Sequence, residues 1–313
     1  MEGSTLIGTG GGGCVYRPPL CGDRSLDYIG KLVDEKKEST QTELTVTKIL
    51  REVKDIEKYA ILVDLSKWCD VDVTPQIAEK CRDAKKYVGK KMLSYQSKYG
   101  GTTLEKYIFD DRPITFRWLY NSFMHLLNGL ALFHQHGVYH IDIKGPNIVI
   151  DDSGTCKFID FGIAIYPGKD VAEISFPFYN VFPLFFNAYI GRDGSHDDDD
   201  YYNTYEGYMK WFDKGYKRDT IYDWIDHERY RAKKELYLED VILPNLSKID
   251  AYQLADTMND LYRKMENIAG GNLSDADKVL SQRIAAMINS MIDPRIDLQS
   301  SVEDVLKKFP PLP

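Results

Sequence analysis

The chain has 313 residues, of which 43% are hydrophobic and 12% aromatic, enough apolar material for about two domain-sized units. Its 40 Lys and Arg residues are outnumbered by 48 Asp and Glu residues, which gives a net charge of −8. An acidic chain lacks the positive surface that a phosphate backbone requires, so we do not expect a nucleic-acid partner.

The cysteines are few and scattered, and none falls in a C-x-x-C pair; they are Cys14, Cys21, Cys69, Cys81 and Cys156. We therefore expect neither a disulfide framework nor a zinc site, and we place the protein in a reducing, intracellular (cytoplasmic) compartment. No run of about 18 apolar residues occurs, and the first residues do not resemble a secretion signal. The sequence predicts no membrane span.

The first third of the chain has the pattern of a small, strand-rich unit. A glycine cluster at 8–13 precedes 28–33, whose loose alternation predicts a strand within an opening hairpin. Apolar residues at three- and four-residue spacing predict a helix over 41–59. Strand-like runs follow at 60–65 and 92–96, and we interpret the polar stretch between these two runs as an insertion or extended loop.

From residue 115 onward the pattern is mainly helical. An apolar stripe over 119–133 predicts a long helix, and 251–265 and 280–291 are also periodic. Two short strand-like runs lie between the first and second of these helices, at 148–150 and 156–159. A strand-rich part thus precedes a helical one.

Two motifs indicate phosphate chemistry. Residues 8–15 fit G-x-G-x-x-G-x-V, in which glycines let backbone N–H groups approach phosphate oxygens; alone, this glycine run is more typical of a flexible linker. Residues 140–147 read H-I-D-I-K-G-P-N, and the D-F-G of 160–162 begins 13 residues after Asn147. The conjunction of these motifs, in this order, is highly specific.

On these motifs the chain resembles the eukaryotic-type protein kinases over nearly its whole length. The resemblance implies an α+β, bilobal fold, with a small antiparallel-sheet lobe at 1–98 and a larger, mainly helical lobe at 99–313. It implies transfer of the γ-phosphate of ATP, with Mg²⁺, to a Ser or Thr hydroxyl of a protein substrate. The lysine at position 144 favours Ser/Thr over Tyr as the acceptor.

The resemblance also assigns roles to individual residues. Asp142 would accept or orient the substrate hydroxyl, and Lys144 would reach the transferred phosphate. Asn147 and Asp160 would be the magnesium ligands, because oxygen donors suit a hard cation. The residues expected to bind ATP are Gly8, Gly10, Gly13, Val15, Lys31 and Glu43.

Two of these assignments have rivals. Lys31 lies 18 residues beyond Gly13 on a predicted strand, which favours it over Lys36 and Lys37 as the phosphate-holding lysine. Its glutamate partner is either Glu43 or Glu52. We choose Glu43, because it lies three residues before Val46 on the apolar stripe of the helix, whereas Glu52 is flanked by charge.

Several other residues have expected places in the site. Residues 95–99 match the segment that takes adenine through backbone groups. We interpret His134 and His136 as capping or solvated, and we expect the His140 ring to bond backbone near the metal-binding strand. Asp250 resembles the aspartate that anchors the catalytic loop from a helix beginning near 248.

The chain departs from the family in three places. Ile141 replaces the arginine that receives an activation-loop phosphate, so we expect activity without that phosphate. Leu184 and Asp297 replace the two members of one buried ion pair. The stretch 184–249 is longer than usual and rich in aromatic residues, and we expect it to shape the choice of substrate or partner.

Two alternative functions remain open, a pseudokinase scaffold and a small-molecule kinase of the aminoglycoside or choline type. The run 7–21, together with the 140–147 loop, resembles serine/threonine kinases encoded by large DNA viruses. That narrower resemblance implies action in a host cell or packaging in a virion. The sequence identifies neither the protein substrate nor the oligomeric state.

Overall fold

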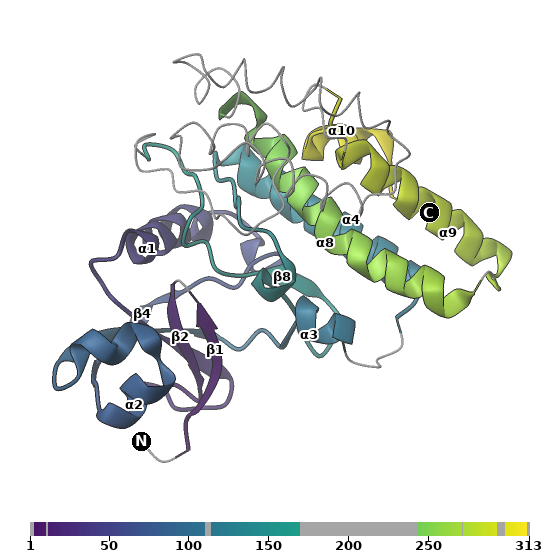
Figure 1. Cartoon of the computed structure of the whole chain (residues 1–313). Coiled ribbons are helices and arrows are strands. Elements are labelled where there is room, and N and C mark those ends of the chain that lie inside the picture. Colours follow the sequence, from purple (N-terminus) through teal and green to yellow (C-terminus); the bar gives the residue numbers. More distant parts are fainter. Residues whose placement is uncertain are drawn as a thin grey trace, which may run out of the picture.

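The computed structural model has two lobes, a small one built on an antiparallel sheet and a larger helical one (Figure 1). It describes residues 3–10, 12–109, 114–169, 243–270, 272–292 and 298–311. Three sequence expectations lie outside these residues: the ion-pair positions Leu184 and Asp297, and all but the last few residues of the aromatic stretch 184–249.

The small lobe is a five-stranded antiparallel sheet of order β1-β2-β3-β5-β4, which confirms the expected N-terminal hairpin. Its strands are β1 (Thr5–Gly10), β2 (Gly13–Arg17), β3 (Tyr28–Val33), β4 (Asp64–Asp72) and β5 (Lys91–Lys98). The predicted strand at 28–33 is confirmed, and that at 92–96 lies within β5. Of the predicted strand at 60–65, only the last two residues belong to β4.

The helix between β3 and β4, α1 (Glu38–Arg51), begins earlier and ends sooner than the apolar spacing predicts. Asp55 has a positive φ of 64°, a left-handed conformation that cannot continue a right-handed helix. The chain instead forms the short 3₁₀ helix η1 (Ile56–Lys58). Val53 and Ile56 are still buried, so their apolar character reflects the core rather than a longer helix.

The polar stretch expected to be a loop is instead ordered secondary structure. It contains most of β4, then α2 (Pro75–Lys80) and the 3₁₀ helix η2 (Arg82–Tyr87). Most of its apolar side chains are buried and build a separate small core on one side of the sheet, together with Cys14, Tyr16, Leu32 and Met92. The expectation of a loop was wrong because buried apolar residues are few in this stretch and are interspersed with many exposed Lys and Asp residues.

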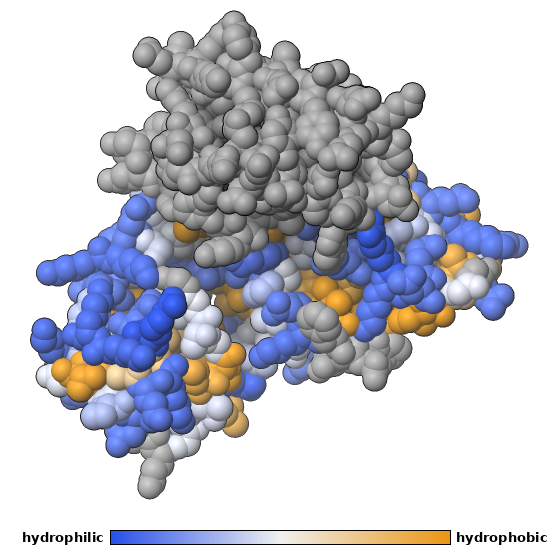
Figure 2. Space-filling view, viewed as in Figure 1, coloured by the Kyte–Doolittle hydropathy of each residue, from blue (hydrophilic) through white to orange (hydrophobic). Residues whose placement is uncertain are grey.

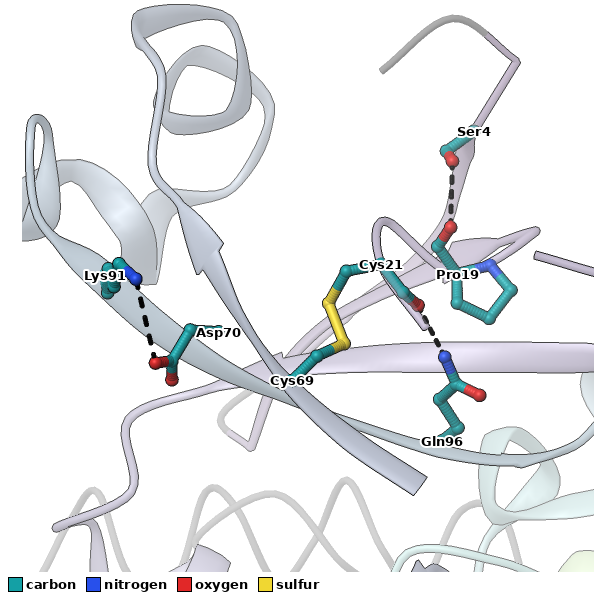
Figure 3. Close-up of a disulfide and its surroundings, with 7 residues drawn as sticks. All are labelled: Ser4, Pro19, Cys21, Cys69, Asp70, Lys91 and Gln96. Carbon is teal, nitrogen blue, oxygen red and sulfur yellow. Dashed lines mark hydrogen bonds and ion pairs between the residues drawn. A yellow bond between two sulfur atoms is a disulfide. The ribbon is translucent and has the colours of Figure 1, made fainter. Parts of the chain in front are cut away.

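Two disulfides, Cys14–Cys81 and Cys21–Cys69, cross-link this lobe and contradict the expectation that there is no disulfide framework. Figure 3 shows the Cys21–Cys69 bond. Their members are 67 and 48 residues apart, and the strand order brings them together. The argument from the cysteines for a reducing compartment therefore no longer holds. Cys156 is free and buried, and burial raises the pKa of its thiol to about 12.

The large lobe packs its helices around one apolar core that includes Phe123, Phe133 and Phe158. Its helices are α3 (Leu104–Phe109), α4 (Phe116–Gln135), α8 (Leu246–Ala269), α9 (Asp275–Met291) and α10 (Val302–Lys308), with 3₁₀ helices η3 (Gly145–Asn147) and η7 (Leu243–Asn245). Helices α4, α8 and α9 lie side by side (Figure 1) and confirm the three predicted helical segments. A small sheet of β6 (Thr102–Thr103), β7 (Ile148–Ile150) and β8 (Cys156–Phe158) confirms the two short strands.

The described surface is mainly hydrophilic in the view of Figure 2, with apolar residues in separate groups. Its large exposed apolar side chains are Ile7, Leu26, Trp68, Val88, Ile268, Val279 and Leu298. Among the helices that the structure describes, none has the length and apolar character needed to cross a membrane.

The two disulfides differ in exposure, which predicts an order of reduction. Cys14 and Cys81 are buried, whereas Cys21 and Cys69 are partly exposed, so a small thiol should reduce Cys21–Cys69 first. Alkylation followed by mass spectrometry should label Cys21 and Cys69 at lower dithiothreitol concentrations than Cys14 and Cys81.

Reduction of Cys14–Cys81, which closes the longer loop, should lower the free energy of unfolding by about 4 kcal/mol in chemical denaturation. A Cys156→Ala variant, which removes the free thiol, is the control and should give the same labelling order. Labelling of all four cysteines in the folded protein without reductant would contradict both cross-links.

Candidate active site

Lys31 lies between carboxylates that come from the two lobes. Its ammonium Nζ is 2.8 Å from Glu43 Oε2 on α1 and 2.9 Å from Asp160 Oδ1, just after β8. Burial alone would lower the pKa of Lys31, but the charges of Asp160 and Glu43 outweigh it and hold that pKa well above its usual value. Burial would raise the pKa of Asp160, yet Lys31 keeps it below its usual value. Lys31 and Asp160 are therefore both charged at neutral pH.

The structure brings Glu43, not its rival Glu52, to Lys31. Glu43 is buried on the side of α1 that faces the sheet, and Glu52 is exposed at the C-terminal end of the helix. Lys37 pairs with Asp83 at 3.2 Å, away from this trio. A second donor to Glu43 that the sequence did not indicate is the hydroxyl of Tyr95 on β5.

Glycines at the turn between β1 and β2 let the backbone approach this lysine. At Gly13, φ is +132° and a Cβ would lie 2.4 Å from the carbonyl oxygen of Leu32, so only glycine fits. A Cβ on Gly12 would lie 3.0 Å from Lys31 Nζ. Gly8 and Gly10 are on β1. Val15 is opposite Lys31 in the β2–β3 register, so the side chains of Val15 and Lys31 lie on the same face of the sheet.

A second cluster surrounds Asp142, in the loop between α4 and β7. Lys144 Nζ lies 2.8 Å from Asp142 Oδ1 and 3.0 Å from Oδ2. The Asn147 amide Nδ2 donates to the Asp142 side chain at 2.8 Å and to its backbone carbonyl at 2.9 Å. These contacts hold the Asp142 carboxylate in one orientation beside two donors.

Two buried side chains of helix α8 hold this loop through hydrogen bonds to its backbone. Asp250 accepts hydrogen bonds from the backbone N–H groups of His140 (2.9 Å) and Ile141 (2.8 Å). Gln253, one turn further on, accepts from Ile143 N–H and donates to the Ile141 carbonyl. Asp250 thus anchors the loop as expected. Gln253 was missed, although its three-residue spacing from Asp250 puts both on one helix face.

These bonds hold the loop in an unusual backbone conformation. Ile141 is fully buried and has a φ of 49°, which costs energy for a β-branched residue. The His140 ring nitrogen Nε2 lies 3.1 Å from the Ile159 carbonyl, so the histidine joins this loop to the end of β8 as expected. Asp160, the next residue, also has a positive φ of 63°.

His134 is neither capping nor solvated, contrary to the sequence interpretation. It is buried, with Nε2 2.9 Å from Asp250 and Nδ1 3.1 Å from Glu303. Burial would lower the pKa of His134, but the hydrogen bonds to the two carboxylates raise it to about 9. The misreading arose because Asp250 and Glu303 lie over 100 residues away in the chain. His136 caps the end of α4 by bonding the Leu132 carbonyl.

The residues expected to touch adenine continue strand β5 as far as Lys98, which pairs with Tyr28. The chain then passes through Gly100 and Gly101 into β6. A Cβ on Gly101 would lie 2.0 Å from the Ile150 carbonyl, so glycine is required where the chain enters the large lobe.

The donor atoms suit a hard divalent cation. Both hydrogen bonds of the Asn147 side chain use its nitrogen, which leaves the amide oxygen Oδ1 for a metal. Asp160 contacts Lys31 through Oδ1, and its Oδ2 remains a possible ligand. An amide oxygen and a carboxylate oxygen are ligands that Mg²⁺ accepts together with phosphate oxygens and water.

A two-lobed α+β fold, with a lysine–carboxylate trio joining the lobes beside an Asp–Lys–Asn loop, defines the protein-kinase class of folds. The sequence model of the protein kinase domain matches residues 1–175, more than half of the chain. The chain therefore belongs to the protein kinase domain family.

Curated relatives match short parts of the chain. The probable serine/threonine-protein kinase PknB of Lactococcus lactis is 36% identical over 64 residues, 20% of this chain and 10% of the relative. Mitogen-activated protein kinase kinase kinase 5 of Arabidopsis thaliana is 38% identical over 74 residues, 23% and 10% of the two chains. A serine/threonine-protein kinase of Saccharomyces cerevisiae is 56% identical over 39 residues, 12% and 3%. The matches thus span a tenth or less of each relative.

The buried His134 predicts a pH dependence of stability. Because its pKa is raised from 6.5 to about 9 on folding, its contribution is complete below pH 6.5 and is lost as the pH rises through about 9. A His134→Gln variant should lose up to about 3 kcal/mol of unfolding free energy at pH 6.5 relative to the wild type, and much less at pH 10. Urea unfolding at both pH values measures this. The control, His136→Gln, should leave the pH dependence unchanged, and an equal loss for His134→Gln at both pH values would contradict the prediction.

Proposed function

We propose that the protein is a serine/threonine kinase that transfers the γ-phosphate of ATP to a protein hydroxyl. The observation that carries this proposal is the Lys31 ammonium held at 2.8 and 2.9 Å between Glu43 and Asp160. A lysine ammonium held in place between two carboxylates can neutralise phosphate oxygens, whereas a scaffold has no need of it. The names of the relatives, which are serine/threonine and mitogen-activated protein kinase kinase kinases, support the class of acceptor.

In this proposal each group acts on a defined part of the reaction. The backbone N–H groups of the glycine turn and the Lys31 ammonium bind the phosphates of ATP. Asp142 accepts the proton of the substrate hydroxyl. Lys144 and Asn147 hold the Asp142 carboxylate in position for this transfer. Lys144 then lies close to the transferred phosphate and offsets its charge. Bound through Asn147 and Asp160, Mg²⁺ would supply charge neutralisation at the phosphates.

Independence from activation-loop phosphorylation is part of the proposal. Ile141, where many kinases have arginine, is buried and cannot receive a phosphate. A different cation connects this region to α1: Lys169 Nζ lies 3.5 Å from Glu38 and 3.4 Å from Thr42. The opposite charges of Lys169 and Glu38 thus join the segment after the D-F-G motif to the start of α1 without a phosphate.

Gly162 favours a protein kinase over a small-molecule kinase, which typically lacks this glycine. A Cβ there would lie 3.3 Å from Asp160 Oδ1 and 3.4 Å from the Ser39 side chain, so glycine lets Asp160 and α1 approach each other closely. The narrower resemblance to kinases of large DNA viruses, with action in a host cell or virion, stays part of the proposal and rests on the 7–21 run together with the 140–147 loop.

Substitution of Asp142, the proposed base, tests the protein-kinase function against the scaffold and small-molecule-kinase alternatives. Asp142→Asn should lower phosphate transfer from labelled ATP to casein by about 100-fold or more, because the amide cannot accept the proton. Asp152→Asn, in the exposed turn after β7, is the matched control and should retain full activity. Full transfer by Asp142→Asn would contradict the assignment. Binding of ATP without transfer by the wild type would instead indicate a scaffold, and transfer only to aminoglycosides or choline would indicate the small-molecule alternative.

Phosphatase treatment tests the proposed independence from loop phosphorylation. Protein treated with a broad-specificity phosphatase should keep its rate of transfer within about twofold, because Lys169, not a phosphate, contacts α1. Mass spectrometry should verify that phosphate has been removed. A collapse of activity that correlates with the loss of one phosphate between residues 163 and 182 would contradict this prediction.

A further inference from the structure

Tyr95 is a buried tyrosine whose hydroxyl points into the lysine–carboxylate trio. It lies opposite Lys31 in the β3–β5 register, so both side chains leave the sheet on the same face. Its hydroxyl donates a hydrogen bond to Glu43 Oε2. Burial, followed by the charge of Glu43, holds the pKa of Tyr95 well above its usual value, so the phenol is neutral and remains a donor at physiological pH.

The same carboxylate oxygen serves two donors of different kinds. Glu43 Oε2 accepts from Lys31 Nζ at 2.8 Å and from the Tyr95 hydroxyl. The Lys31 ammonium is shared with Asp160, and in the proposed reaction it must also meet phosphate oxygens. Among the residues that the structure describes, the Tyr95 hydroxyl makes no hydrogen bond other than the one to Glu43. Its backbone is fixed within the sheet, on β5 between β3 and the edge strand β4.

We propose that Tyr95 is a positioning residue that holds Glu43, and with it helix α1, against the sheet while Lys31 engages the nucleotide. Glu43 is a buried carboxylate, and losing a donor to such a charge is costly. With Tyr95 in place, Glu43 keeps one neutral donor when Lys31 turns toward phosphate. Glu43 can therefore remain where it directs Lys31. This proposal rests on the proposed kinase function for its consequence, but the contact with α1 can be tested without activity.

Tyr16 provides a matched control on the opposite face of the same sheet. It is as deeply buried as Tyr95, at 3% exposure for each, and it packs in the small core beneath α2. Its hydroxyl has no hydrogen-bond partner within the described part of the chain. Tyr16→Phe and Tyr95→Phe thus remove the same atom from equally buried sites, and only the latter breaks a contact with Glu43.

Hydrogen exchange of the α1 amides is the first test. Tyr95→Phe should speed exchange over residues 42–51 by about tenfold relative to the wild type, because the Glu43 carboxylate on α1 loses the hydrogen bond that Tyr95 donates from the sheet. Tyr16→Phe should leave these amides unchanged. Equal exchange of α1 in the two variants would overturn the proposal, whatever the protein's activity.

A double-mutant cycle with Glu43 is the second test. Alone, Tyr95→Phe should lower kcat/KM for ATP by about tenfold, and Tyr16→Phe should not lower it. In a Glu43→Ala background, which removes the acceptor, Tyr95→Phe should cost little further, because Tyr95 acts through Glu43. The same fall in both backgrounds would overturn the proposal. A wild type that transfers no phosphate would refute the proposed kinase function instead, and hydrogen exchange would still decide the role of Tyr95.

Discussion

The placement of Lys31 between two carboxylates is the interaction on which the site depends. Glu43 belongs to a helix packed on the small lobe, and Asp160 follows a strand of the large lobe, so one ammonium joins both. A buried charge is stable only when opposite charges compensate it closely. The contacts that fix the two lobes relative to each other at this point thus also place the Lys31 ammonium where it can hold phosphate oxygens.

The second requirement is a rigid loop around Asp142, and helix α8 of the large lobe holds this loop in place. Asp250 and Gln253 on α8 satisfy four backbone groups of the loop, which compensates for the left-handed conformation of Ile141. His134 in turn pairs with Asp250 and links it to Glu303 of α10. These hydrogen bonds therefore connect α10 to the backbone of the loop that carries the proposed base.

The small lobe carries reinforcement that such a thin sheet would otherwise lack. Its inner face supplies Lys31 and Tyr95, and its outer face is covered by a separate core beneath α2 and η2. One disulfide joins Cys14 on β2 to Cys81, between α2 and η2, and the other joins Cys21, in the loop after β2, to Cys69 on β4. Cross-links across long loops reduce the freedom of the unfolded chain, so the strands around the glycine turn are held from both sides.

The sequence by itself determined the local elements and the residues of the Asp142 loop and the D-F-G motif, because their spacing is short and each is specified by neighbours in the chain. Strand 28–33 and the helix over 119–133 followed from periodicity alone. The apolar stripe of the following helix also indicated Glu43 rather than Glu52 as the partner of Lys31. Only the tertiary structure decided the other pairings: Gln253 and Tyr95 as donors, His134 as a buried cation, and the two disulfides. Each joins residues that are distant in sequence, and no local pattern encodes which distant partner a buried polar side chain will meet.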